Sequence, residues 1–183
     1  MRFGAQVMAG IADSASDGVA DFLRCLSVLE EKTSLLFEDI AGKMESISFN
    51  SKLREISNDN RRHAKILMEM SQHVGNPKVE IKECRRKLSS VFRKIEQVHN
   101  EVSQKEKITA QQLQRFISIL DSSESEEQFM LIQAKTFQFM SKEIDRLYGV
   151  NFEKYRNLLV SIAKDEENHR QILDEIGEIL GKN

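Results

Sequence analysis

Residues that interrupt helices are scarce in this sequence, which contains one proline, Pro77, and eight glycines among its 183 residues. So few helix breakers leave little room for the repeated tight turns of a β-sandwich or a β-barrel. Hydrophobic residues make up 40% of the chain, which is enough to form a core and excludes the disordered class. The composition therefore predicts a single all-α domain over residues 1–183.

Long apolar runs and an excess of one charge are also missing. No stretch of about eighteen apolar residues exists to span a membrane, and the formal net charge is only −2. The basic residues between Lys82 and Lys94 are interleaved with glutamates, which is typical of a solvated helix face rather than a nucleic-acid interface. We expect neither nucleic acid nor a membrane among the partners.

Cysteine is rare as well. Cys25 and Cys84 make neither a disulfide framework nor a Cys-x-x-Cys metal knuckle. We interpret both as small apolar residues in a reducing compartment. Residues 1–16 lack the leucine-rich core of a secretory signal, so we interpret them as an N-terminal extension and expect a cytoplasmic protein.

Four stretches of the chain carry apolar residues at alternating steps of three and four, the pattern of bundle helices. They are residues 23–40, 53–74, 129–147 and 159–180, and Gly75-Asn76-Pro77 ends the second of them. Residues 79–121 between the second and third stretches are also helical in pattern, with a helix start at Thr109. A four-helix bundle whose second and third helices run the same way needs such a return, because crossing about 30 Å takes about twenty helical residues. We predict two helix hairpins joined by a helical crossover.

The crossover carries apolar residues of its own, which predict a homodimer. Residues 79–104 and 109–120 each have an apolar face that needs a surface to bury against. A two-fold dimer is the commonest way to cover such faces.

The two halves of the chain repeat one pattern. Residues 59–67 and 165–173 both read Asp-x-x-x-His-x-x-Ile-Leu. The helical register places polar residues of each half in an otherwise apolar seam, and these are Glu30, Asn60, His63, Gln133, Glu166 and His169. A carboxylate buried in such a seam without a partner costs several kcal/mol or shifts its pKa. A metal ion is the obvious compensation.

This arrangement resembles the ferritin-like superfamily, in particular its rubrerythrin-type four-helix bundles. The di-iron site of that family takes a Glu from each of two helices and a Glu-x-x-His from each of the other two. Glu30 matches a lone Glu, Glu166 and His169 form a Glu-x-x-His, and His63 matches the other histidine. Asn60 and Gln133 stand where the remaining two glutamates would be.

The resemblance implies a metal site of Glu30, His63, Glu166 and His169, with a role in iron, oxygen or peroxide chemistry. Glu30 and Glu166 supply a charge of −2, which suits one divalent ion per chain. Imidazole and carboxylate ligands suit Fe, Mn or Zn, and the sequence does not choose among them.

A metal-free alternative stays open at this point. Asn60 and Gln133 are able to donate amide protons to Glu30 and Glu166, which would make the seam a hydrogen-bonded network. The chain would then be a structural or partner-binding bundle. Asp59 and Asp165 stand four residues before the histidines, where an aspartate is able to form a hydrogen bond or ligate a metal, but we interpret them as parts of a solvated flank.

Overall fold

The structure is a computed structural model that describes residues 3–120 and 153–181, with the side chains of residues 17–120 and 155–181. Every regular element in these ranges is an α-helix, which confirms the all-α class. The helices are α1 (Phe3–Lys43), α2 (Ile47–Val74), α3 (Ile81–Lys87), α4 (Ser89–Ser103), α5 (Ala110–Leu120) and α7 (Glu153–Gly181). The predicted helix over residues 129–147, with Gln133, lies outside the described residues.

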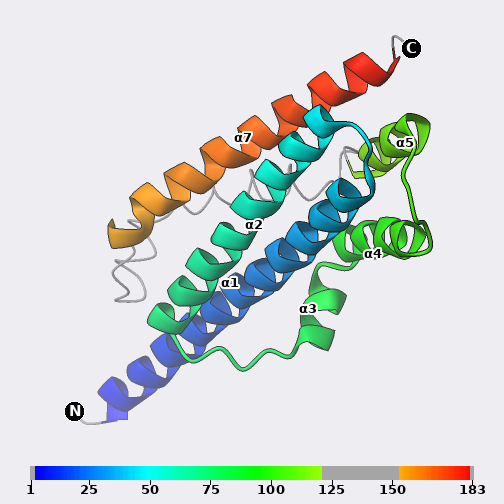
Figure 1. Cartoon of the computed structure of the whole chain (residues 1–183). Coiled ribbons are helices and arrows are strands. Elements are labelled where there is room, and N and C mark those ends of the chain that lie inside the picture. The colour runs from blue at the N-terminus through cyan, green and yellow to red at the C-terminus, as the bar shows by residue number, and fades with distance from the viewer. Residues whose placement is uncertain (1–2, 121–152, 182–183) are drawn as a thin grey trace.

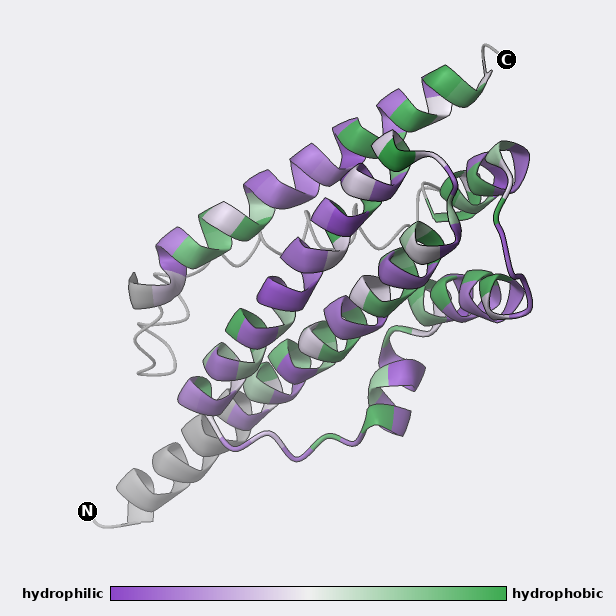
Figure 2. Cartoon of the chain, viewed as in Figure 1, coloured by the Kyte–Doolittle hydropathy of each residue, from purple (hydrophilic) through white to green (hydrophobic). Residues whose placement is uncertain are grey.

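The helices are arranged around an antiparallel hairpin of α1 and α2 (Figure 1). Helix α7 lies along α2, α3 and α4 pack on α1, and α5 contacts α4 and α7. Hydrophobic and hydrophilic residues alternate along the long helices (Figure 2), the pattern expected of helices with one apolar face. The core forms where these faces meet. No helix in the described part of the chain is long and apolar enough to cross a membrane.

Helices α1 and α2 are held at close range by small residues that recur every seven positions. Four side chains donate a hydrogen bond to a backbone carbonyl of the other helix: Ser27 to Ala64 at 2.7 Å, Ser57 to Ser34 at 2.9 Å, Ser71 to Ala20 at 2.6 Å and Asn50 to Ala41 at 2.7 Å. A seven-residue repeat keeps one seam of each helix facing the other along their whole length. These four hydrogen bonds, called rungs below, fix the register of α2 against α1.

The end of α2 is where the sequence predicts it. Gly75 follows the last residue of the helix, and its backbone N–H bonds to the carbonyl of Ser71. The chain then turns back to α1, where the carboxylate of Asp21 accepts hydrogen bonds from the backbone N–H groups of Lys78 and Val79 at 2.7 and 3.0 Å. Helix α1 itself begins at Phe3, so it runs through most of the expected extension of residues 1–16.

Residues 79–120, most of the predicted crossover, contain the three short helices α3, α4 and α5. Helix α5 begins directly after Thr109, as predicted, and Thr109 and Gln112 each bond the other's backbone N–H. The apolar residues of α4 and α5 are buried within the chain, among them Phe92, Val98 and Phe116. They therefore give no support to the expected homodimer, which stays a prediction.

The interpretation of the cysteines as free residues is wrong, because Cys25 of α1 and Cys84 of α3 form a disulfide. Their Cα atoms are 5.0 Å apart and both side chains are fully buried. The two residues are 59 positions apart in sequence, and only the packing of α3 on α1 brings them together. The reducing compartment inferred from free cysteines loses this support, and the cytoplasmic location stays an expectation.

We predict that reduction of the Cys25–Cys84 disulfide destabilises the chain by about 4 kcal/mol, because the bond closes a long loop in the unfolded state. Guanidinium unfolding with and without dithiothreitol measures this loss. The Cys25→Ala, Cys84→Ala variant is the control, since its unfolding should not respond to dithiothreitol. Identical unfolding curves for the oxidised and reduced wild type would contradict the prediction.

Candidate metal centre

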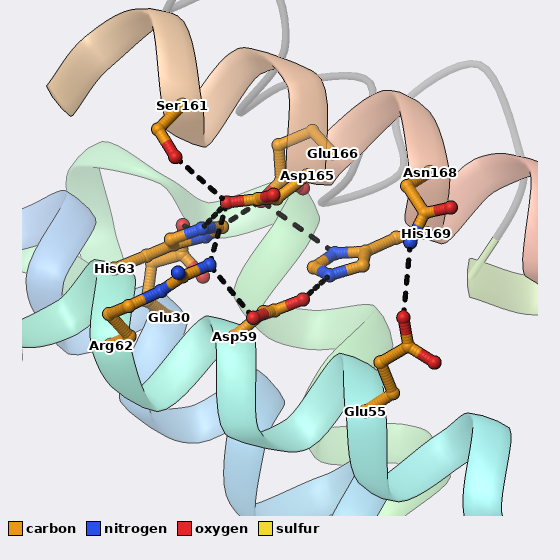
Figure 3. Close-up of polar contacts among 10 residues, drawn as sticks. All are labelled: Glu30, Glu55, Asp59, Arg62, His63, Ser161, Asp165, Glu166, Asn168 and His169. Atoms are coloured by element: carbon orange, nitrogen blue, oxygen red, sulfur yellow. Dashed lines mark hydrogen bonds and ion pairs between the residues drawn. The ribbon is translucent and has the colours of Figure 1, made fainter. Parts of the chain in front are cut away.

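Three helices bring two carboxylates and an imidazole together in the interior. Glu30 comes from α1, His63 from α2 and Glu166 from α7, and Figure 3 shows their side chains converging. The exposed fractions of these side chains are 0%, 0% and 1%. One ligand atom from each lies within 4.8 Å of the other two, so the group can hold a metal ion. The buried positions predicted from the helical register are thus confirmed for these residues, and also for Asn60 and His169.

The distances within this group match the edges of a metal coordination shell. His63 Nδ1 lies 3.0 Å from Glu166 Oε1 and 3.4 Å from Glu30 Oε1. Two ligand atoms about 2.1 Å from one metal ion are about 3.0 Å apart at a right angle and about 3.4 Å apart at a tetrahedral angle. These two distances are those of neighbouring ligands around a common ion, and all three ligand atoms lie within 4.8 Å of one another.

The same atoms lack hydrogen bonds. Within the described residues, neither the four carboxylate oxygens of Glu30 and Glu166 nor His63 Nδ1 has a hydrogen-bond partner. His169 Nδ1, 3.8 Å from Glu166 Oε1, has none either. Leaving a buried carboxylate without donors is costly. Carboxylate lone pairs that converge in the interior attract a cation, either a protonated imidazole such as His63 or a metal ion.

The metal-free alternative predicted that Asn60 would donate to the buried carboxylates. Asn60 is buried at 1% exposure, but its amide nitrogen makes no hydrogen bond in the described part of the structure. Asn60 therefore does not supply the donor that this network needs. The other predicted donor, Gln133, lies outside the described residues.

Each histidine is oriented by an aspartate from the opposite half of the repeat. His63 Nε2 lies 3.1 Å from Asp165 Oδ2, and His169 Nε2 lies 3.3 Å from Asp59 Oδ2 (Figure 3). An Nε2–H group that donates to a carboxylate leaves Nδ1 as the ligating atom. The interpretation of these aspartates as a solvated flank is wrong: Asp-x-x-x-His on two antiparallel helices lets each aspartate reach the other helix's histidine.

Arg62 lies at the surface and bonds the aspartates of both histidine–aspartate pairs. Its guanidinium lies 2.8 Å from Asp59 Oδ1 and 2.7 Å from Asp165 Oδ2 (Figure 3). Because it bonds both aspartates at once, Arg62 holds the two histidine–aspartate pairs at a fixed separation. The side chain is half exposed, so its charge costs little desolvation. The position that corresponds to Arg62 in the second copy of the repeat is Asn168, so only the first copy carries an arginine.

The buried charges shift one another's pKa values. Burial raises the pKa of Glu30 to about 7, with a further increase from the charge of Glu166. Burial works to lower the pKa of His63, but Glu166 and Glu30 outweigh it and raise that pKa to about 11. Burial likewise works against His169, yet Asp59 and then Glu166 raise its pKa to about 9. Despite burial, the two imidazoles hold the pKa of Glu166 below its usual range.

In the absence of a cation, these shifts mean that protons neutralise the cluster. Both imidazoles are charged at neutral pH and lie against the buried carboxylates. A metal ligand must be a neutral imidazole, so a metal ion and the protons compete for the same site.

Comparison of this chain with models of protein families, with curated proteins and with solved structures finds no match.

We predict that metal binding at this site releases protons and tightens as pH rises. The pKa of His63 is raised to about 11, so its imidazole is protonated at neutral pH and must lose that proton to coordinate. The apparent affinity for Zn(II) should increase up to about tenfold per pH unit for each proton released. Titration calorimetry in two buffers of different protonation enthalpy measures the number of protons. An affinity independent of pH, with no proton release, would be the contrary result, and the exposed His99→Gln variant should behave as wild type.

Proposed function

We propose that this chain binds one divalent transition-metal ion per molecule through Glu30, His63 and Glu166. The observation that carries the proposal is the convergence of these buried ligand atoms, with His63 Nδ1 at 3.0 Å from Glu166 Oε1 and 3.4 Å from Glu30 Oε1. Buried polar groups in native proteins are almost always paired, and a group that is not calls for an explanation such as a bound ion. Here the lone pairs still converge.

Charge and ligand type select the class of ion. Glu30 and Glu166 together neutralise a charge of +2, and the neutral amide of Asn60 adds nothing to that. Two carboxylates and an imidazole are ligands of Fe(II), Mn(II) and Zn(II). His169 Nδ1 lies 3.8 Å from Glu166 Oε1, close enough to become the fourth ligand after a small movement. The resulting centre is mononuclear and keeps open positions for a small molecule.

The proposal includes a ferritin-like arrangement of the bundle. The α1–α2 hairpin supports it, with Glu30 on the first helix and His63 on the second, and α7 contributes the Glu-x-x-His of Glu166 and His169. The repeated Asp-x-x-x-His pattern supports it as well, because its two copies bond reciprocally. In this proposal the chain handles iron, oxygen or peroxide at a centre that retains half of the glutamates of a di-iron site.

The test is metal stoichiometry in a matched pair of variants. Wild-type protein reconstituted with Fe(II), Mn(II) or Zn(II) without oxygen should retain one ion per chain by elemental analysis. Glu30→Gln keeps the shape of the side chain and removes a charged ligand, so it should weaken binding at least a hundredfold. The same change at the neighbouring exposed residue, Glu31→Gln, should have no effect.

The metal-free stability of these variants checks the same claim. Burial penalises the charge of Glu30, so Glu30→Gln without metal should melt at the same temperature as wild type or higher. Metal should then raise the melting temperature of wild type and of Glu31→Gln only, through binding linkage. A wild type that retains no metal, or two glutamate variants that bind it equally, would refute the proposed function.

A further inference from the structure

Two buried polar side chains beside the three ligands have no part in the proposed metal site. Asn60 and Thr33 are each 1% exposed. The amide nitrogen and oxygen of Asn60 and the hydroxyl of Thr33 have no hydrogen-bond partner in the described residues. Because an unpaired buried amide or hydroxyl costs free energy, both side chains call for a partner that the described residues do not supply.

Their position follows from the rungs of the α1–α2 hairpin. The Ser27–Ala64 and Ser57–Ser34 hydrogen bonds enclose one seven-residue interval of each helix. Within this interval Thr33 stands one turn from Glu30 on the same face of α1. Asn60 stands one turn from His63 on the same face of α2. The two unpaired side chains therefore adjoin the ligand cluster on the side of the Ser57–Ser34 rung.

The chemistry of these groups favours a ligand of the metal over a second metal. A neutral amide and a hydroxyl balance none of the charge of a second divalent ion and are weak ligands for one. As hydrogen-bond donors they are well suited, since Asn60 offers two N–H groups and Thr33 one O–H. Donors placed beside a metal stabilise a ligand that carries negative charge.

We propose that Asn60 and Thr33 form a hydrogen-bonding subsite for a small anion bound to the metal, of the size of azide or formate. The inference rests on the proposed function, because Glu30, His63 and Glu166 must hold the metal first. The size limit comes from enclosure: the side chains of the ligands and of the two donors are all at most 1% exposed. Both donors act by positioning the anion and make no bond to the metal.

The test uses Co(II) as the metal, because its visible spectrum reports both metal binding and the arrival of a further ligand. Azide is titrated into Co(II)-loaded wild type, Asn60→Ala and Thr33→Val. Each substitution should raise the dissociation constant of azide about tenfold or more, the loss expected for one hydrogen bond to a charged group. The affinity for Co(II) itself should change less than about threefold, since neither side chain is a ligand.

The control is Ser71→Ala, which removes a buried donor that bonds Ala20 at another rung of the same hairpin. It should leave the affinity for azide unchanged. Thr33→Val keeps the shape of the side chain, so its dissociation constant for azide tests the inference even if Asn60→Ala is poorly folded. Normal Co(II) binding with no azide response, or with equal azide affinity in wild type and both variants, overturns the inference and leaves the proposed function standing. Failure of wild type to bind Co(II) overturns both.

Discussion

Two buried carboxylates that converge on one imidazole in the interior are the constraint on which this structure depends. Glu30 and Glu166 come from helices far apart in sequence, and their oxygens meet around His63 Nδ1 within 4.8 Å. Such a cluster is stable only if positive charge enters it, as protons on the imidazoles or as a metal ion. The surrounding fold supports this arrangement: the seven-residue rungs fix α1 against α2, and the histidine–aspartate pairs fix α7 against α2.

The buried polar positions were predictable because helical register is a local property. An apolar stripe with a period of 3.6 residues identifies the face that turns inward, so Glu30, His63 and Glu166 could be placed in the core from sequence alone. The end of α2 at Gly75 was predictable for the same reason, since glycine and proline act on their own neighbourhood. The arrangement of four helices in a ferritin-like bundle is a different kind of statement and stays a proposal.

Contacts between distant segments were not predictable in this way. The Cys25–Cys84 disulfide depends on α3 packing against α1. The Asp165–His63 and Asp59–His169 contacts depend on two antiparallel helices lying side by side. A signal for the second case was present, because Asp-x-x-x-His occurs twice, but its meaning appears only when the two copies are placed against each other. The small residues Ala20, Ser27, Ser34 and Ala41 also repeat every seven positions, a pattern that apolar periodicity does not include because two of them are serines.

The most direct test of a metal centre is a crystal structure of the protein loaded with Zn(II) or Mn(II), with data collected at the absorption edge of that metal. We expect one anomalous peak between the three ligands, about 2.0–2.2 Å from His63 Nδ1 and from a carboxylate oxygen of Glu30 and of Glu166. His63 should keep its Nε2 contact with Asp165. A cluster without an anomalous peak, closed by hydrogen bonds among the same side chains, would contradict the account.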